Sequence, residues 1–184
     1  MTATAEDLVA RWTIPLQNKT YEIEFEHGTT TGKRIVRVDG KAEVIRREWM
    51  FKLVGKETFS IGNIKCSINA EAHGPFSYLY TLEILGKTYE KFIEDQGRKL
   101  QIWYVDVGAN QHRICLDKKT MDIWVDGKKV NTAGEFVDDG TETHFEIDDV
   151  GCCVKTTSSG KRTTGVIHRL FLEDNEIPPF SEGT

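Results

Sequence analysis

Apolar and polar residues alternate along much of this chain. Residues 21–25 read Tyr-Glu-Ile-Glu-Phe, and a similar alternation recurs over residues 34–38 and 64–68. Because successive side chains of an extended segment point to opposite faces, this pattern gives each segment one apolar face. A period of two residues is typical of a half-buried β-strand. The pattern therefore predicts β-strands for these segments.

Turn-forming residues separate the apolar segments at short intervals. Asp-Gly pairs occur at residues 39–40, 126–127 and 139–140. Asp-Gly readily adopts the positive φ angles that tight hairpins need. Short strands joined by such turns predict an all-β fold with antiparallel pairing.

One segment, residues 41–53, is long enough to be considered as a helix. Its apolar residues Trp49, Met50 and Phe51 are consecutive and do not line one helical face. We therefore predict strand and loop for this segment. Consecutive large apolar residues can either fill a core or bind a partner. The three residues are accordingly candidate partner contacts.

The two halves of the chain contain matching residues in the same order. Residues 38–41, Val-Asp-Gly-Lys, recur as residues 125–128. Further matches are Trp12 with Trp103, Phe59 with Phe145, Cys66 with Cys152, and Leu82 with Leu170. A colinear series of this kind predicts a duplicated β domain.

A polar stretch at residues 95–99 separates the two halves. We therefore expect two tandem homologous domains, residues 1–95 and 99–184, each of about 85–95 residues. Many short strands with frequent turns are typical of an antiparallel β-sandwich or a barrel-like fold.

Composition excludes several classes of function. The 184 residues include 24 Lys and Arg against 29 Asp and Glu, which gives a formal charge of −5. An acidic chain is poorly suited to nucleic acid, which is bound by neutralising phosphates. No apolar run reaches the roughly 18 residues of a membrane span, and the N-terminal residues do not resemble a secretory signal. We expect a cytoplasmic protein that binds neither nucleic acid nor membrane.

The four cysteines show no metal-binding spacing. No Cys-x-x-Cys pair is present, so structural zinc is not expected. In a reducing compartment free thiols are favoured over the two disulfides that four cysteines could form. Alternation turns Cys66 and Cys152 toward the core and Cys115 and Cys153 outward. We expect Cys115 and Cys153 to be the exposed thiols.

No motif of a known catalytic class is present. No serine lies in Gly-x-Ser-x-Gly, no segment fits the phosphate-binding Gly-rich loop, and the five histidines lie in no nucleophile motif. We therefore expect no catalytic residues, no cofactor and no enzyme activity. An enzyme or small-ligand sandwich would need a pocket with convergent polar groups, which the sequence does not demand.

Charged residues cluster in the second half. Seven carboxylates lie within residues 135–149, among them Asp138, Asp139 and Glu142. They could bind a hard cation or form a solvated edge that blocks unwanted strand pairing; we favour the solvated edge and expect no metal. Lys161 and Arg162 form a loop of opposite charge. These five charged residues are candidate partner contacts.

Four segments resemble the Fas apoptotic inhibitory molecule family: residues 25–34, 48–59, 132–145 and 158–162. The resemblance implies a cytosolic, two-domain, all-β protein without known enzymatic activity. It also implies roles in protection from Fas-triggered apoptosis, in survival and neurite signalling, and in protection from stress-induced protein aggregation. It implies no catalytic or ligand-binding residue.

Two kinds of protein partner follow from these features. Misfolded clients would be held through apolar surface such as residues 49–51. A specific death-receptor or survival-signalling component would be held through the charged segments, and that binding would weaken with salt. In both cases we expect a monomer or weak homodimer.

Overall fold

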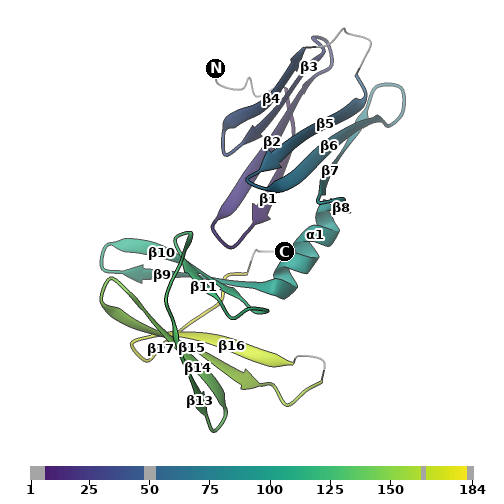
Figure 1. Ribbon diagram of the computed structural model, residues 1–184. Coiled ribbons are helices and arrows are strands. Elements are labelled where there is room, and N and C mark those ends of the chain that lie inside the picture. The colour runs from purple at the N-terminus through teal and green to yellow at the C-terminus, as the bar shows by residue number, and fades with distance from the viewer. Residues whose placement is uncertain (1–6, 48–52, 163–164, 182–184) are drawn as a thin grey trace. The chain divides into compact units, whose positions relative to one another are not determined.

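The computed structural model describes residues 7–47, 53–162 and 165–181. The chain divides into two compact units, one of residues 1–16 and 20–96 and the other of residues 17–19 and 97–184. The described residues form four antiparallel sheets and one short helix (Figure 1). The all-β prediction is therefore confirmed.

The first unit contains two four-stranded meanders, in which consecutive strands are neighbours. One sheet consists of β1 (Leu8–Pro15), β2 (Thr20–Gly28), β3 (Lys33–Val38) and β4 (Lys41–Arg47). The other consists of β5 (Gly55–Ile61), β6 (Ile64–Ala72), β7 (Tyr78–Ile84) and β8 (Lys87–Thr88). The strand predicted within residues 41–53 is thus β4, whereas residues 48–52 lie outside the described part of the chain.

Apolar side chains from both sheets fill the core of the first unit. Ile23 and Phe25 of β2 pack in one cluster with Ile68 of β6 and Leu82 of β7, and all four are buried. The alternation in the sequence is what places them on one face of each sheet. The unit is therefore a β-sandwich, and neither of its sheets closes into a barrel.

A helix that the sequence analysis did not predict, α1 (Tyr89–Lys99), follows β8. It begins where the hydroxyl of Thr88 accepts a hydrogen bond from the backbone N–H of Lys91, at 3.3 Å, as in a helix N-cap. Tyr89, Phe92 and Ile93 form a short apolar stripe at helical spacing, and Phe92 is buried in the core of the first unit. The helix includes the polar residues 95–99, and the two compact units divide within this stretch, between Gln96 and Gly97.

The second unit has a four-stranded and a five-stranded meander. The first consists of β9 (Leu100–Val107), β10 (Asn110–Asp117), β11 (Ile123–Val125) and β12 (Lys128–Lys129). The second consists of β13 (Ala133–Val137), β14 (Gly140–Ile147), β15 (Val150–Ser158), β16 (Val166–Leu172) and β17 (Asn175–Ile177). Trp103 and Ile114 of the first sheet and Phe145, Val154 and Leu170 of the second share a buried cluster, so this unit is also a sandwich.

Matching residues of the two halves adopt matching structure. Asp39 and Asp126 both have positive φ, 50° and 47°. The Asp39 carboxylate accepts a hydrogen bond at 2.9 Å from the backbone N–H of Glu22. The Asp126 carboxylate accepts one at 2.9 Å from the backbone N–H of Arg113. The Asp-Gly repeat therefore marks equivalent hairpin turns, β3–β4 and β11–β12.

Among the described residues, no helix has the length and apolar character that a membrane span requires.

Candidate functional site

The outer face of the five-stranded sheet collects charged and sulfur-containing side chains. Directly paired residues of an antiparallel sheet point to the same face. Glu142 of β14 pairs with Glu135 of β13 on one side and with Lys155 of β15 on the other. Two residues further along β14, His144 pairs with Cys153 of β15. These five side chains therefore share the face opposite to the core residues.

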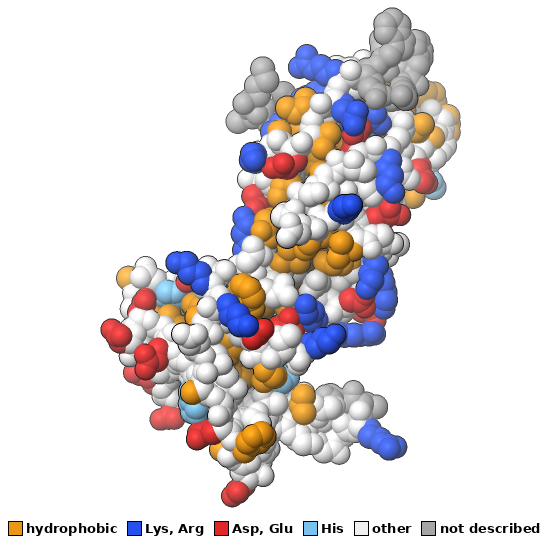
Figure 2. Space-filling model, viewed as in Figure 1, with side chains coloured by type: hydrophobic (Ala, Val, Ile, Leu, Met, Phe, Trp, Pro, Cys, Tyr) orange, Lys and Arg blue, Asp and Glu red, His pale blue; other side chains and the backbone are white. Residues whose placement is uncertain are grey.

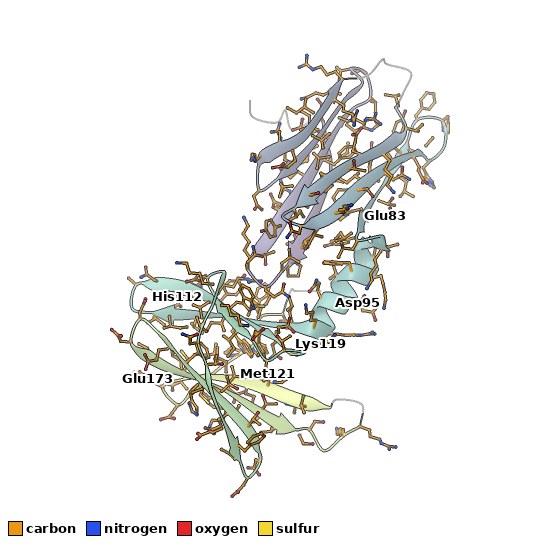
Figure 3. All side chains as sticks on the ribbon, in the orientation of Figure 1. Glu83, Asp95, His112, Lys119, Met121 and Glu173 are labelled. Atoms are coloured by element: carbon orange, nitrogen blue, oxygen red, sulfur yellow. The ribbon has the colours of Figure 1, made fainter. Side chains whose placement is uncertain are left out.

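A groove of about 1000 Å³ lies on this face. The segment of residues 128–133, which leads from β12 into β13, forms one border. Phe171 of β16 and Glu173, in the turn after β16, are also part of its lining; Glu173 is labelled in Figure 3. The groove leaves the His144 and Cys153 side chains accessible to small solutes.

The His144 imidazole lies between two carboxylates. Its Nε2 atom is 3.0 Å from Glu135 Oε1 and 3.3 Å from Glu142 Oε2. The other oxygen of Glu142 accepts a hydrogen bond from Lys155 Nζ at 2.9 Å, and this bond is the main reason that the pKa of Glu142 is lowered. Figure 2 shows that acidic side chains are frequent on the visible surface of the second unit.

Cys153 completes this group. Donor atoms of Glu142, His144 and Cys153 all lie within 4.8 Å of one another. The Cys153 thiol is half-buried, and this burial raises its pKa. The negative charge of Glu142 raises the pKa of Cys153 further. A thiol with a raised pKa is a poor nucleophile at neutral pH, but an imidazole, a thiol and two carboxylates are suitable metal ligands. Glu142 and Cys153 were predicted separately, as a partner contact and an exposed thiol, and neither was connected with His144.

Cys115 is fully buried, so the prediction that it is an exposed thiol is wrong. It lies on the face of β10 that also carries Arg113 and Asp117, opposite to the core. Gln17, which belongs to the same unit, covers that face: its carbonyl accepts from Arg113 Nη1 at 3.0 Å, and its side chain donates to Asp117 Oδ2 at 3.3 Å. Burial raises the pKa of Cys115 to about 11.

Strand β13 is the edge of its sheet, and all five of its residues are exposed. The Phe136 side chain is 94% exposed, although phenylalanine is usually buried. An edge strand presents backbone N–H and C=O groups that can pair with another chain. The exposure of Phe136 could not be predicted, because two apolar residues between Glu135 and Asp138 are equally compatible with a buried strand.

The structure brings four of the predicted charged contacts to one end of this sheet. Asp138 and Asp139 form the turn between β13 and β14, and Lys161 and Arg162 lie in the loop between β15 and β16. Since Gly140 pairs with Thr157, these two connections emerge at the same sheet end. All four are exposed. Glu142, the fifth, lies within the strand.

The predicted contact residues Trp49, Met50 and Phe51 lie outside the described residues.

The first unit contains buried charges, but they are paired. Glu26 lies 3.1 Å from Lys33 Nζ and 3.0 Å from Arg37 Nε. Glu57 lies between Arg34 and Arg46. The Glu26 pairs connect neighbouring strands of one sheet, whereas the Glu57 pairs connect the two sheets. Paired buried charges of this kind are typical of structural networks.

These observations define a class: a protein of two consecutive β-sandwich units, with an accessible groove and an exposed edge strand on the second. Comparison with known proteins identifies the family. The profile described as Fas apoptotic inhibitory molecule (FAIM1) matches residues 8–180. The chain therefore belongs to the Fas apoptotic inhibitory molecule family.

Three curated relatives are similar over nearly the whole chain. Fas apoptotic inhibitory molecule 1 of Homo sapiens is 54% identical over 94% of this chain and 97% of its own length. The Mus musculus protein of that name is 52% identical, with 96% and 99% covered. The Bos taurus protein is 53% identical, with 96% and 88% covered. The resemblance expected from the sequence motifs is thereby confirmed.

Proposed function

We propose that this protein is an inhibitor of apoptosis that acts in the cytoplasm by binding other proteins and catalyses no reaction. Membership of the family supports the anti-apoptotic role, because the relatives are named for inhibition of Fas-dependent apoptosis. The observation that carries the binding mode is the exposed edge strand β13 with its solvent-exposed Phe136.

The edge strand supports protection against stress-induced aggregation. Aggregating chains associate largely through unpaired strand edges and apolar side chains. Strand β13 offers backbone pairing to such a segment, and Phe136 adds apolar contact. Asp138 and Asp139 at the end of the strand oppose parallel pairing between two copies of this chain, because like charges directly opposite each other repel. The client would thus be held as an added strand.

Light scattering from a heat-aggregating client, without ATP, tests this function. The protein at an equimolar ratio should suppress scattering, and Phe136→Ser should suppress it markedly less. Phe76→Ser is the matched control, because Phe76 is 96% exposed and lies in the first unit. Equal activity of the two variants would contradict the role of β13, and no suppression by the unmodified protein would contradict client holding.

A second candidate function is that of a signalling adaptor. It is favoured by the two oppositely charged connections, residues 138–139 and 161–162, at one end of the sheet. Exposed charges mainly steer association and are screened by salt. Binding to a death-receptor or survival-signalling component should therefore weaken as salt is raised. Client holding through Phe136 should not weaken, which separates the two functions.

A further inference from the structure

Three adjacent strands direct four potential metal ligands to one point on the outer face of the second unit. Glu142 and His144 come from β14, Cys153 from β15 and Glu135 from the edge strand β13. None of the four forms part of the hydrophobic core. Their donor atoms converge although they are separated along the sequence, and Glu135 and Glu142 both face one imidazole nitrogen.

We propose that Glu142, His144 and Cys153 bind a divalent transition-metal ion, Zn²⁺ by the chemistry of its ligands, with Glu135 as the fourth ligand. Thiolate, imidazole and carboxylate are the ligands that Zn²⁺ uses in proteins. Ca²⁺ and Mg²⁺ prefer sites made of oxygen atoms alone, so the thiol and imidazole argue against both. This inference does not rest on the proposed function.

The spacing of the donor atoms suits such an ion. Bonds of about 2.0–2.3 Å in a tetrahedron place neighbouring ligand atoms about 3.3–3.8 Å apart. The donor atoms of the three central residues already lie within 4.8 Å of one another. Pairing of β14 with β15 holds the His144 and Cys153 backbones directly opposite each other. Closure therefore needs only side-chain rotation, and the groove leaves room for it.

Lys155 is the group that opposes binding. Its ammonium lies 2.9 Å from Glu142 Oε1, while the oxygen that faces His144 is Oε2. A metal ion on Oε2 would be repelled by this neighbouring positive charge. Removing the charge should therefore raise the affinity for a cation, although it removes an ion pair from the folded protein.

Binding would have three consequences for the protein. Cys153 must lose its proton to become a ligand, so affinity rises with pH and binding releases protons. Glu135 is on β13, so the ion would also link the edge strand to β14 and β15. It would block alkylation of Cys153 for as long as it is bound.

Titration of the reduced, metal-free full-length protein with Co²⁺, followed by Zn²⁺, tests the proposal. Co²⁺ replaces Zn²⁺ in such sites and gives a sulfur-to-metal charge-transfer absorption when a thiolate binds. We expect this band to saturate at one equivalent and to disappear when Zn²⁺ is added. Cys153→Ser should abolish the band. His144→Gln should weaken binding about tenfold or more, and Lys155→Ala should strengthen it several-fold.

Two variants serve as controls. Glu176→Gln removes a carboxylate from the same outer face, where Glu176 pairs with Phe171, and His73→Gln removes an exposed imidazole from the first unit. Both should bind Co²⁺ as the unmodified protein does. Absence of the band in excess Co²⁺, or its persistence in Cys153→Ser, would overturn the proposal. Equal losses in His144→Gln and His73→Gln would do the same, and circular dichroism would establish that each variant is folded.

Discussion

The Arg34 guanidinium lies 3.1 Å from the Glu57 carboxylate, and both side chains are almost fully buried. Arg46 donates a hydrogen bond to the other oxygen of the same carboxylate at 2.6 Å. Glu57 is on β5, whereas both arginines are on the sheet formed by β1–β4. The interaction therefore connects the two layers of the first sandwich.

Replacing Glu57 should strongly destabilise the first unit. Glu57→Gln removes the negative charge that faces the buried Arg34 guanidinium, and breaking a buried ion pair typically costs about 3–5 kcal/mol. Urea-induced unfolding measures the loss. Glu83→Gln is the control, because Glu83 (Figure 3) forms a more exposed pair with Lys56 at 2.8 Å. Similar unfolding midpoints for the two variants would contradict a structural role for Glu57.

Alkylation of the folded protein should modify Cys153 and spare Cys66, Cys115 and Cys152. The last three are buried, and burial raises the pKa of each to about 11. Cys153 is half-buried, but its raised pKa keeps it largely protonated, so its labelling should be slow at neutral pH and faster in alkali. Mass spectrometry should find one iodoacetamide adduct before denaturation and four after it. Modification of Cys115 at the rate of Cys153 would contradict this order.

The strands could be predicted because their signal is local. Residues 21–25 and 64–68 alternate, and they lie in β2 and β6. The helix α1 could not be found in this way, because only a short apolar stripe faces the core and Phe92 is its buried residue. The neighbouring polar residues and Gly97 are also typical of a linker.

The candidate site could be predicted only in part. Alternation determines the face on which a side chain lies, but it does not reveal what covers that face. For this reason the prediction for Cys115, which lies between the two residues that Gln17 binds, is wrong. The cluster around His144 depends on the pairing of β14 with β15, which places Cys153 opposite the imidazole. Strand register is a long-range property that no single segment encodes.

Stability should fall as the pH is lowered below the ordinary histidine pKa of about 6.5. Burial lowers the pKa of both His27 and His168 in the folded protein. A nearby positive charge lowers each pKa further, that of Arg34 for His27 and that of Lys118 for His168. The unfolded chain therefore binds more protons in this range. The stability that comes from keeping the two histidines neutral is fully present above their pKa in the unfolded chain. It is lost as the pH falls through their lowered pKa values in the folded protein.

Urea unfolding at several pH values between about 7.5 and 5 measures this dependence. His168→Gln should reduce the slope, whereas His73→Gln should retain it, because His73 is exposed. Carboxylates with a lowered pKa, such as Glu26, reduce the free energy of unfolding only at more acidic pH, where they become protonated. A free energy of unfolding that stays constant over this range would contradict the assignment to the two buried histidines.

Gly140 at the start of β14 should not tolerate a side chain. Its φ is +151°, and a Cβ atom there would clash with the backbone oxygen of Thr156 on β15. Because neither strand can move away without breaking the ladder, Gly140→Ala should destabilise the second unit by about 1–3 kcal/mol. Gly134→Ala, in the same hairpin, is the matched control, since a Cβ at Gly134 meets no atom within 4 Å. It should change stability by less than about 0.5 kcal/mol. Equal unfolding midpoints for the two variants would mean that the β14–β15 contact is looser than the structure describes.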